Sequence, residues 1–275
     1  MKLSKETAHR AGPTAERRFE IDAADLVAPR ISVCMATYNG SEWVAEQLDS
    51  IFAQLDTTDE VIIVDDASTD NTVQVVQNYG DPRIKLTVQP ENQGYVKTFE
   101  HSLSLATGEF ILVSDQDDVW APGRVEKMVG ALAAGADVVA TNLATLGGPD
   151  AVRGPLGQKD WHLKAADSTH RFRNTVSLVL GNMCYWGCAM GLRRSALDLI
   201  LPFPPYLTES HDLWIAIYGN VVGRMRHLEF RSLWWRNHAS NTNPKKPRGP
   251  ITLIRKRWMM TRAVLTMLHR RFRAN

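Results

Sequence analysis

Cysteine, long apolar runs and, towards the end of the chain, acidic side chains are scarce in this sequence. Three cysteines among 275 residues exclude a disulfide-stapled scaffold and fit a reducing compartment. The most apolar long stretch, 176–192, contains Asn182 and three glycines, whereas a bilayer span needs about 20 mostly apolar residues. Residues 1–30 lack the apolar core of a signal peptide. We therefore expect a cytoplasmic protein, with peripheral contact to the inner face of the plasma membrane left open.

The charges are distributed unevenly along the chain. The 32 Lys and Arg residues nearly balance the 30 Asp and Glu residues, which leaves a net charge of +2. Twelve basic residues and no acidic ones lie from Phe230 onward, so the preceding residues carry 20 − 30 = −10. A basic tail on an acidic body predicts an anionic partner, either a membrane surface or nucleic acid. We expect no nucleic acid, because no recognised binding motif accompanies the charge.

The composition is that of an ordinary globular protein, with 44% hydrophobic and 23% charged residues in a chain long enough for one large domain or two small ones. Residues 1–29 show no hydrophobic period and are expected to form a mobile N-terminal arm. Over 30–142, apolar runs alternate with amphipathic stretches, which predicts an α/β fold with a mainly parallel sheet. Residues 143–242 are less regular, and 243–275 form the basic tail.

The alternation predicts a series of short elements in the first half. We expect strands at 31–36, 61–64, 84–88, 110–113 and 137–140, and helices at 43–52, 71–79, 95–106 and 122–134. Asp70 is predicted as the N-cap of the second helix, and Pro122 as the first residue of the fourth. In the second half we expect helices near 169–180 and 212–222 and one or two strands within 226–238.

Polar residues directly follow three of the predicted strands. They are Thr37-Tyr38-Asn39, Asp65-Asp66 and Asp115-Gln116-Asp117-Asp118. In an open α/β sheet, ligands bind outside the carboxyl ends of the strands. We therefore expect these residues to converge at one edge of the sheet although they lie far apart in sequence.

The third motif has three carboxylates in four residues. Such groups repel one another unless a cation is present, and oxygen ligands suit Mg²⁺ or Mn²⁺. A solvated acidic turn is the alternative, but the position at the end of an apolar strand favours a site. Asp66, also at a strand end, can accept a hydrogen bond from a base or a ribose.

Four segments of the first half resemble motifs of family 2 glycosyltransferases with a GT-A fold, in the order found in that family. They are 31–40, 64–72, 92–94 and 114–122. In the second half, 187–194 resembles the acceptor-side segment of the family, and 210–214 and 235–241 resemble its bacterial rhamnosyltransferase-like branch. The resemblance covers about residues 30–242 and leaves out the arm and the tail.

The resemblance implies roles for the residues at the strand ends. Thr37 and Tyr38 would line the nucleotide base, and Asp66 would hold the base by a hydrogen bond. Asp115 would approach the ribose or the metal ion. Asp117, the last Asp of the DxD-type motif, would bind the divalent ion, Mn²⁺ or Mg²⁺, that bridges the donor diphosphate.

Two residues of the second half complete the implied site. Asp212 matches the catalytic base of the family, and His238 would complete the metal or diphosphate site. Many members have Glu-Asp where this chain has His211 and Asp212, so the base is retained and the contact with the acceptor is in question. Sugar transfer needs a stabilised leaving group and a base near the acceptor hydroxyl, which these residues would supply.

Several smaller signals have two interpretations. Trp214, beside Asp212, could stack on a sugar ring, although most tryptophans are core residues. Lys97 and His101 could face the diphosphate or belong to a solvated helix face. Cys184 and Cys188 could share a helix face, but without nearby His partners their spacing favours core packing over a metal site.

Apolar residues recur at helical spacing in the basic tail. They are Ile251, Ile254, Trp258, Leu265, Leu268 and Phe272. A basic amphipathic helix over 251–273 could bind an anionic membrane surface, at about 1 kcal/mol per Lys or Arg near the surface. Alternatively, the helix packs on the catalytic domain and exposes a basic face.

The sequence thus predicts a GT-A-type α/β domain, with a nucleotide-sugar-binding half at 30–142 and an acceptor-binding half at 143–242. We expect an inverting, metal-dependent glycosyltransferase that moves a sugar from dTDP-rhamnose or a UDP-sugar to a saccharide or lipid-linked acceptor in cell-surface polysaccharide synthesis. Two alternatives stay open. A nucleotidyltransferase is disfavoured because residues 37–43 contain no Lys or Arg, and a non-catalytic membrane-associated scaffold because Asp117 and Asp212 are intact.

Overall fold

The protein is described by a computed structural model over residues 30–238 and 249–274, so the predicted arm at 1–29 lies outside the described residues. The described chain forms an eight-stranded sheet in the order β3-β2-β1-β4-β7-β6-β8-β5. The strands are β1 (Ile31–Thr37), β2 (Glu60–Asp65), β3 (Ile84–Val88), β4 (Phe110–Ser114), β5 (Val119–Trp120), β6 (Val138–Thr145), β7 (Met190–Arg193) and β8 (Met225–Trp235). The predicted mainly parallel α/β sheet is confirmed: β3, β2, β1 and β4 are parallel neighbours, as are β6 and β8, while β7 and β5 run antiparallel.

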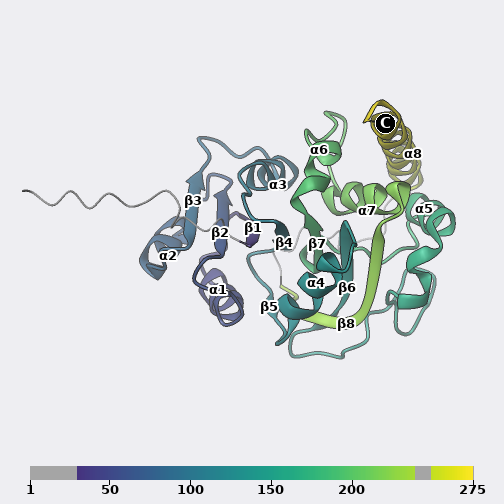
Figure 1. The fold of residues 1–275 in the computed structure, drawn as a ribbon. Coiled ribbons are helices and arrows are strands. Elements are labelled where there is room, and N and C mark those ends of the chain that lie inside the picture. Colours follow the sequence, from purple (N-terminus) through teal and green to yellow (C-terminus); the bar gives the residue numbers. More distant parts are fainter. Residues whose placement is uncertain (1–29, 239–248, 275) are drawn as a thin grey trace, which may run out of the picture.

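Helices cover both faces of the sheet (Figure 1). They are α1 (Val44–Phe52), α2 (Thr72–Tyr79), α3 (Tyr95–Ser104), α4 (Arg124–Ala133), α5 (Arg171–Leu180), α6 (Leu197–Ile200), α7 (His211–Val222) and α8 (Pro250–Ala274). Side chains alternate along β2: Val61 and Ile63 pack with α1, α2 and α4, whereas Ile62 packs with α3 and α7. The unbroken apolar run of β2 therefore reflects burial on both faces.

Two helix starts differ from the prediction by one or two residues. Asp70 is not the N-cap of α2: Asn71 occupies that position, and the Asp70 carboxylate accepts the Thr72 N–H at 2.9 Å from one residue earlier. Pro122 precedes α4, which begins only after Gly123 adopts a left-handed conformation at φ 78°. In both cases a short turn separates the predicted first residue from the observed start of the helix.

The tail helix α8 packs on the catalytic domain. Met260, Ala263 and Met267 are completely buried in the core cluster that also contains α7. The packing alternative for the tail is therefore correct for this stripe of the helix. Within the described ranges 30–238 and 249–274, no helix combines the length and apolar character that crossing a bilayer requires.

Candidate functional site

The polar residues after β1 and β2 meet at one edge of the sheet, because the two strands are parallel neighbours. Asp65 accepts hydrogen bonds from the hydroxyls of Thr37 (2.7 Å) and Ser68 (2.6 Å) and from the Ser68 N–H (2.8 Å). Thr37 is consequently buried, with its hydroxyl engaged inside the protein. The side chain of Tyr38 is 45% exposed, and its backbone N–H and C=O are both bonded to the Gln116 amide.

Asp66 is buried and holds the loop that precedes α3. Its Oδ1 accepts the Gln93 N–H at 2.7 Å, and its Oδ2 accepts the Gly94 N–H at 2.9 Å. Gly94 has φ 85°, a conformation that glycine adopts without strain. Each carboxylate oxygen has a second acceptor position. Asp66 can therefore fix this loop and still accept a hydrogen bond from a ligand.

The acidic motif after β4 is crowded and partly without partners. Burial, followed by the charges of Asp118 and Asp117, raises the pKa of Asp115 well above its usual range. Burial and the Asp117 charge raise the pKa of Asp118 to about 7. Asp118 accepts the Arg236 N–H at 3.2 Å through Oδ1, while its buried Oδ2 has no partner among the described residues. A cation placed among these carboxylates would reduce their mutual repulsion and lower their pKa values.

The end of β8 brings His238 to this motif. The Nε2 atom of His238 lies 2.7 Å from Oδ2 of Asp117, and the imidazole stacks on Trp43 with ring centroids 3.9 Å apart. Arg236 donates to the Asp117 carbonyl at 2.9 Å and pairs with Glu46 of α1 at 2.5 Å. The chain after β8 thus lies across the acidic motif and places an imidazole and a carboxylate together.

The donor atoms at this edge fit a hard divalent cation. Carboxylate oxygens of Asp115 and Asp118 and the Cys188 sulfur lie within 4.8 Å of one another. Burial raises the pKa of the Cys188 thiol well above its usual range, so the sulfur stays protonated and is a poor ligand. The carboxylates remain, with the Asp117 and His238 pair beside them. Oxygen-rich sets of this kind suit Mg²⁺ or Mn²⁺.

Arg124, which is not among the predicted site residues, is a buried cation beneath the acidic motif. Its guanidinium donates to the carbonyls of Val113 (3.1 Å) and Cys188 (2.6 Å) and to the Ser232 hydroxyl (2.7 Å). It also lies 4.3 Å from the centre of the Trp120 ring. Burial lowers the Arg124 pKa to about 10, which leaves it charged at neutral pH. No local pattern marks an arginine at a helix start as buried.

Asp212 approaches the site from the first turn of α7. Its Oδ1 accepts the Leu213 N–H at 2.8 Å. Burial raises the Asp212 pKa to about 6, and the Asp212 charge contributes in turn to the raised pKa of Asp115. The two carboxylates therefore lie within electrostatic reach although they come from opposite halves of the chain.

His211 is buried beside Asp212 in an aromatic setting. It stacks on Phe99 at 4.1 Å between ring centroids and meets the Tyr95 ring edge-on at 5.7 Å. Burial lowers its pKa to about 3, so the ring is neutral, and neither ring nitrogen has a hydrogen-bond partner among the described residues. A Cβ on Gly187 would lie 2.9 Å from His211 Nε2, which explains the glycine there.

Helix α3 connects the two halves of the site. The Tyr95 hydroxyl accepts the N–H of Ser210 at 3.1 Å, and Ser210 has a left-handed φ of 65° immediately before α7. Tyr95 directly follows the loop that Asp66 holds. The position of Asp212 therefore depends on the same segment that Asp66 fixes.

Two of the smaller signals are resolved by packing. Trp214 is completely buried and donates its indole N–H to the Ile200 carbonyl, so the prediction that it could stack on a sugar is wrong. Cys184 and Cys188 are both buried in the core, as favoured, but in different clusters.

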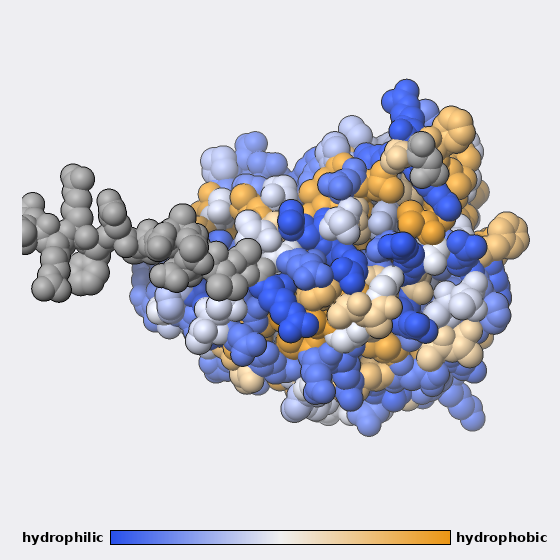
Figure 2. All heavy atoms as spheres, in the orientation of Figure 1, coloured by the Kyte–Doolittle hydropathy of each residue, from blue (hydrophilic) through white to orange (hydrophobic). Residues whose placement is uncertain are grey.

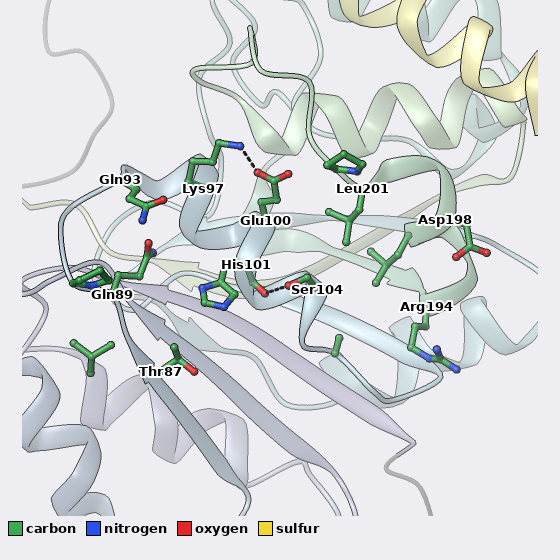
Figure 3. A pocket seen from close by; sticks show the side chains of 15 residues that line it. Thr87, Gln89, Gln93, Lys97, Glu100, His101, Ser104, Arg194, Asp198 and Leu201 are labelled. Carbon is green, nitrogen blue, oxygen red and sulfur yellow. Dashed lines mark hydrogen bonds and ion pairs between the residues drawn. The ribbon is translucent and has the colours of Figure 1, made fainter.

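Lys97 and His101 of α3 line an open cavity of about 1000 Å³, together with Gln93, Arg194 and Asp198 (Figure 3). Lys97 pairs with Glu100 at 2.6 Å there. The carboxylates of the site are not among the lining residues, so the solvated-face interpretation of this helix is the better one.

Comparisons with known proteins give a consistent result. The family model described as "Glycosyl transferase family 2" matches residues 32–201. An uncharacterized glycosyltransferase of Nostoc sp. is 28% identical over 228 residues, which cover 78% of this chain and 66% of that protein. A dTDP-rhamnosyl transferase of Shigella flexneri is 35% identical over 105 residues, 36% of each chain. The chain thus spans between about a third and two thirds of these relatives' own lengths.

A solved structure shares the fold. Residues 1–349 of Staphylococcus aureus TarS, in complex with UDP-GlcNAc, superpose with a TM-score of 0.66 at 20% identity, covering 88% of this chain and 72% of the other. At that identity the likeness concerns the fold alone. The mixed, mostly parallel sheet flanked by helices is therefore the GT-A-type architecture that the sequence predicted.

Proposed function

Because the chain belongs to glycosyl transferase family 2, we propose that it transfers a sugar from a nucleotide-diphospho donor to a saccharide or lipid-linked acceptor. One observation supports this above all: the acidic motif, His238 and Asp212 converge at the carboxyl edge of the sheet. The buried carboxylate of Asp212 near this cluster counts against a non-catalytic scaffold, and the absence of Lys and Arg from residues 37–43 counts against a nucleotidyltransferase.

In this proposal, Asp117 and His238 hold a divalent ion, Mn²⁺ or Mg²⁺, and Asp115 faces the ribose or the ion. The 2.7 Å contact between Asp117 and His238 and the partnerless Oδ2 of Asp118 support the assignment. A bound divalent ion supplies Lewis-acid stabilisation of the leaving diphosphate. Arg124 keeps the carboxylates in place from below through the carbonyls of Val113 and Cys188.

Asp212 is proposed as the base. A pKa of about 6 leaves this carboxylate ionised at pH 7 to 8 while making it more basic than an exposed Asp. It can accept the proton of the acceptor hydroxyl as that oxygen attacks the anomeric carbon. One base and a direct displacement invert the configuration at that carbon, so we propose an inverting enzyme.

Thr37, Tyr38 and Asp66 are proposed to bind the nucleotide. Tyr38 offers an exposed ring beside the buried Asp66 carboxylate, whose second lone pairs can accept a base N–H. The hydroxyl of Thr37 is engaged with Asp65, so Thr37 would shape the base pocket through its backbone.

The donor is proposed to be dTDP-rhamnose or a UDP-sugar. The similarity to the dTDP-rhamnosyl transferase of Shigella flexneri supports the first, and the UDP-GlcNAc complex of TarS supports the second. We place the reaction in the cytoplasm, in cell-surface polysaccharide synthesis, with an anionic membrane surface as the place where a lipid-linked acceptor is met. The boundaries at 30–142 and 143–242 are proposed as the donor and acceptor halves, and 243–275 as the tail.

Nucleotide release from a panel of UDP-, dTDP- and GDP-sugars tests the proposal. The wild type and Asp117→Ala are compared with Mn²⁺, Mg²⁺ or EDTA. Slow, metal-dependent hydrolysis of one donor that disappears in Asp117→Ala is the expected result. If no donor is hydrolysed and none raises the melting temperature, the glycosyltransferase assignment is wrong; a donor-induced shift without turnover indicates that the acceptor is required.

A further inference from the structure

Helix α8 has a second apolar stripe on the side away from its packing face. The buried stripe is Met260, Ala263 and Met267. A different set of positions, spaced by three, four or seven residues, is exposed to solvent: Ile251, Ile254, Trp258, Leu265, Leu268 and Phe272. Their exposed fractions lie between 47% and 83%. A helix that is apolar on two separate stripes has one stripe more than packing on this domain requires.

Helix α5 adds apolar side chains beside this stripe. Phe172, Val176 and Leu180 recur every four residues and are 84%, 40% and 64% exposed. The two helices lie together: both contact α7 and each other, and Arg257 of α8 reaches Gly181 at the end of α5. Figure 2 shows orange side chains gathered over α8 at the upper right, with blue side chains among them. We call the two exposed rows together the α5–α8 surface.

The charges around this surface are basic. Arg255, Arg262 and Arg273 are exposed on α8, and Arg171 and Arg173 on α5. Neither helix contains Asp or Glu. Two acidic groups of neighbouring segments form ion pairs with these helices, Asp167 with Arg173 at 2.6 Å and Glu209 with Lys256 at 3.3 Å, which leaves Arg171, Arg255, Arg262 and Arg273 to give the surface its positive charge. The surface thus combines apolar rows with flanking guanidinium groups.

We propose that the α5–α8 surface docks on an anionic phospholipid bilayer. A helix lying in the plane of the interface places its apolar side chains at the boundary between head groups and acyl chains, and its arginines among the phosphates. A second copy of this chain is a poorer occupant, because a two-fold interface would bring like charges together. The proposal rests on the membrane contact included in the proposed function and deepens it by assigning that contact to the α5–α8 surface, and it does not depend on which sugar is moved or whether the acceptor is a lipid.

Co-sedimentation of the full chain with vesicles tests this surface. One set of vesicles contains phosphatidylcholine alone, and the other a mixture with phosphatidylglycerol. We expect binding to the mixed vesicles, weakening with salt, because each arginine near an anionic surface strengthens binding by about fivefold. Equal binding to both sets of vesicles would overturn the anionic part of the proposal.

Two double variants and one control separate the helices. Trp258→Ser/Leu265→Ser on α8 and Phe172→Ser/Leu180→Ser on α5 should each weaken binding by about tenfold. Leu156→Ser, at an equally exposed leucine outside both helices, should leave it unchanged. If only the α8 variant loses binding, α5 is not part of the surface and the joint proposal fails.

Two further readouts distinguish the remaining outcomes. Nucleotide release from the donor identified in the panel assay should stay within twofold in both double variants, because the four substituted side chains are exposed to solvent and none of them is proposed to bind donor, metal ion or acceptor. Circular dichroism melts check that the variants fold. Sedimentation velocity detects self-association: variants that lose a dimer while their vesicle binding is unchanged would assign the surface to a second copy of the chain and overturn the lipid proposal.

Discussion

Two sets of carboxylates, those that follow β2 and those that follow β4, lie at the same edge of the sheet but differ in their hydrogen-bond partners. After β2, every carboxylate oxygen of Asp65 and Asp66 accepts a hydrogen bond from the protein. After β4, Asp115 and Asp118 are buried beside Asp117 with raised pKa values, and one oxygen of Asp118 has no partner among the described residues. The protein's own hydrogen bonds satisfy the first set completely and the second set only in part. Strand-end carboxylates with a similar sequence appearance can therefore differ in their hydrogen-bond environment.

The largest effect is expected at Asp212. Like Asp115 and Asp118 after β4, Asp212 is buried and has a raised pKa. Asp212→Asn should lower the transfer rate by about 10²- to 10⁴-fold, the usual contribution of a general base. The rate is measured at saturating donor, and donor-induced thermal stabilisation should persist as the control. Unchanged transfer would remove Asp212 from the mechanism.

The next largest effect is expected at Arg124, the buried cation beneath the carboxylates that follow β4. Arg124→Met should lower the free energy of unfolding by about 3–5 kcal/mol, because it leaves buried carbonyls and carboxylates without their positive partner. Urea unfolding measures the loss. Glu126→Gln on the same helix serves as an exposed control. A loss below about 1 kcal/mol would show that Arg124 does not hold the motif.

A matched pair of variants tests the comparison directly. At pH 8 without metal, Asp65→Asn should lower the free energy of unfolding by about 1–3 kcal/mol, since an amide N–H₂ would then face Thr37 or Ser68. Asp118→Asn should instead raise it, because it removes a charge that burial and Asp117 disfavour. Melting curves with and without Mn²⁺ measure both, and equal losses would refute the distinction between the two sets.

The smallest effect is a pH dependence. With a pKa of about 6 and activity in the ionised form, Asp212 predicts a transfer rate that is constant above pH 7 and falls as the pH drops through 6, reaching about a tenth by pH 5. Rates at saturating donor from pH 5 to 8 measure it, with melting curves to exclude acid unfolding. If the rate fell with a midpoint near pH 4 instead, the base would be a solvent-exposed carboxylate and not the buried Asp212.

The first half of the chain was predictable in detail because its signals are local. Unbroken apolar runs mark strands buried on both faces, and polar residues at their ends mark the ligand edge. Small errors at Asp70 and Pro122 arose from turns of one or two residues. Resemblance to the family implied that Asp117 binds a metal ion and that His238 completes the metal or diphosphate site, and the structure places the two side chains 2.7 Å apart.

The sequence by itself determined the α/β class, the strand-end motifs and the basic tail, because each depends on neighbouring residues. Only the tertiary structure decided that Arg124 is buried under the acidic motif, that Trp214 belongs to the core, and that α8 packs through one stripe while exposing another. Those features depend on contacts between segments distant in the chain, and no local pattern encodes which of two apolar stripes the fold will cover.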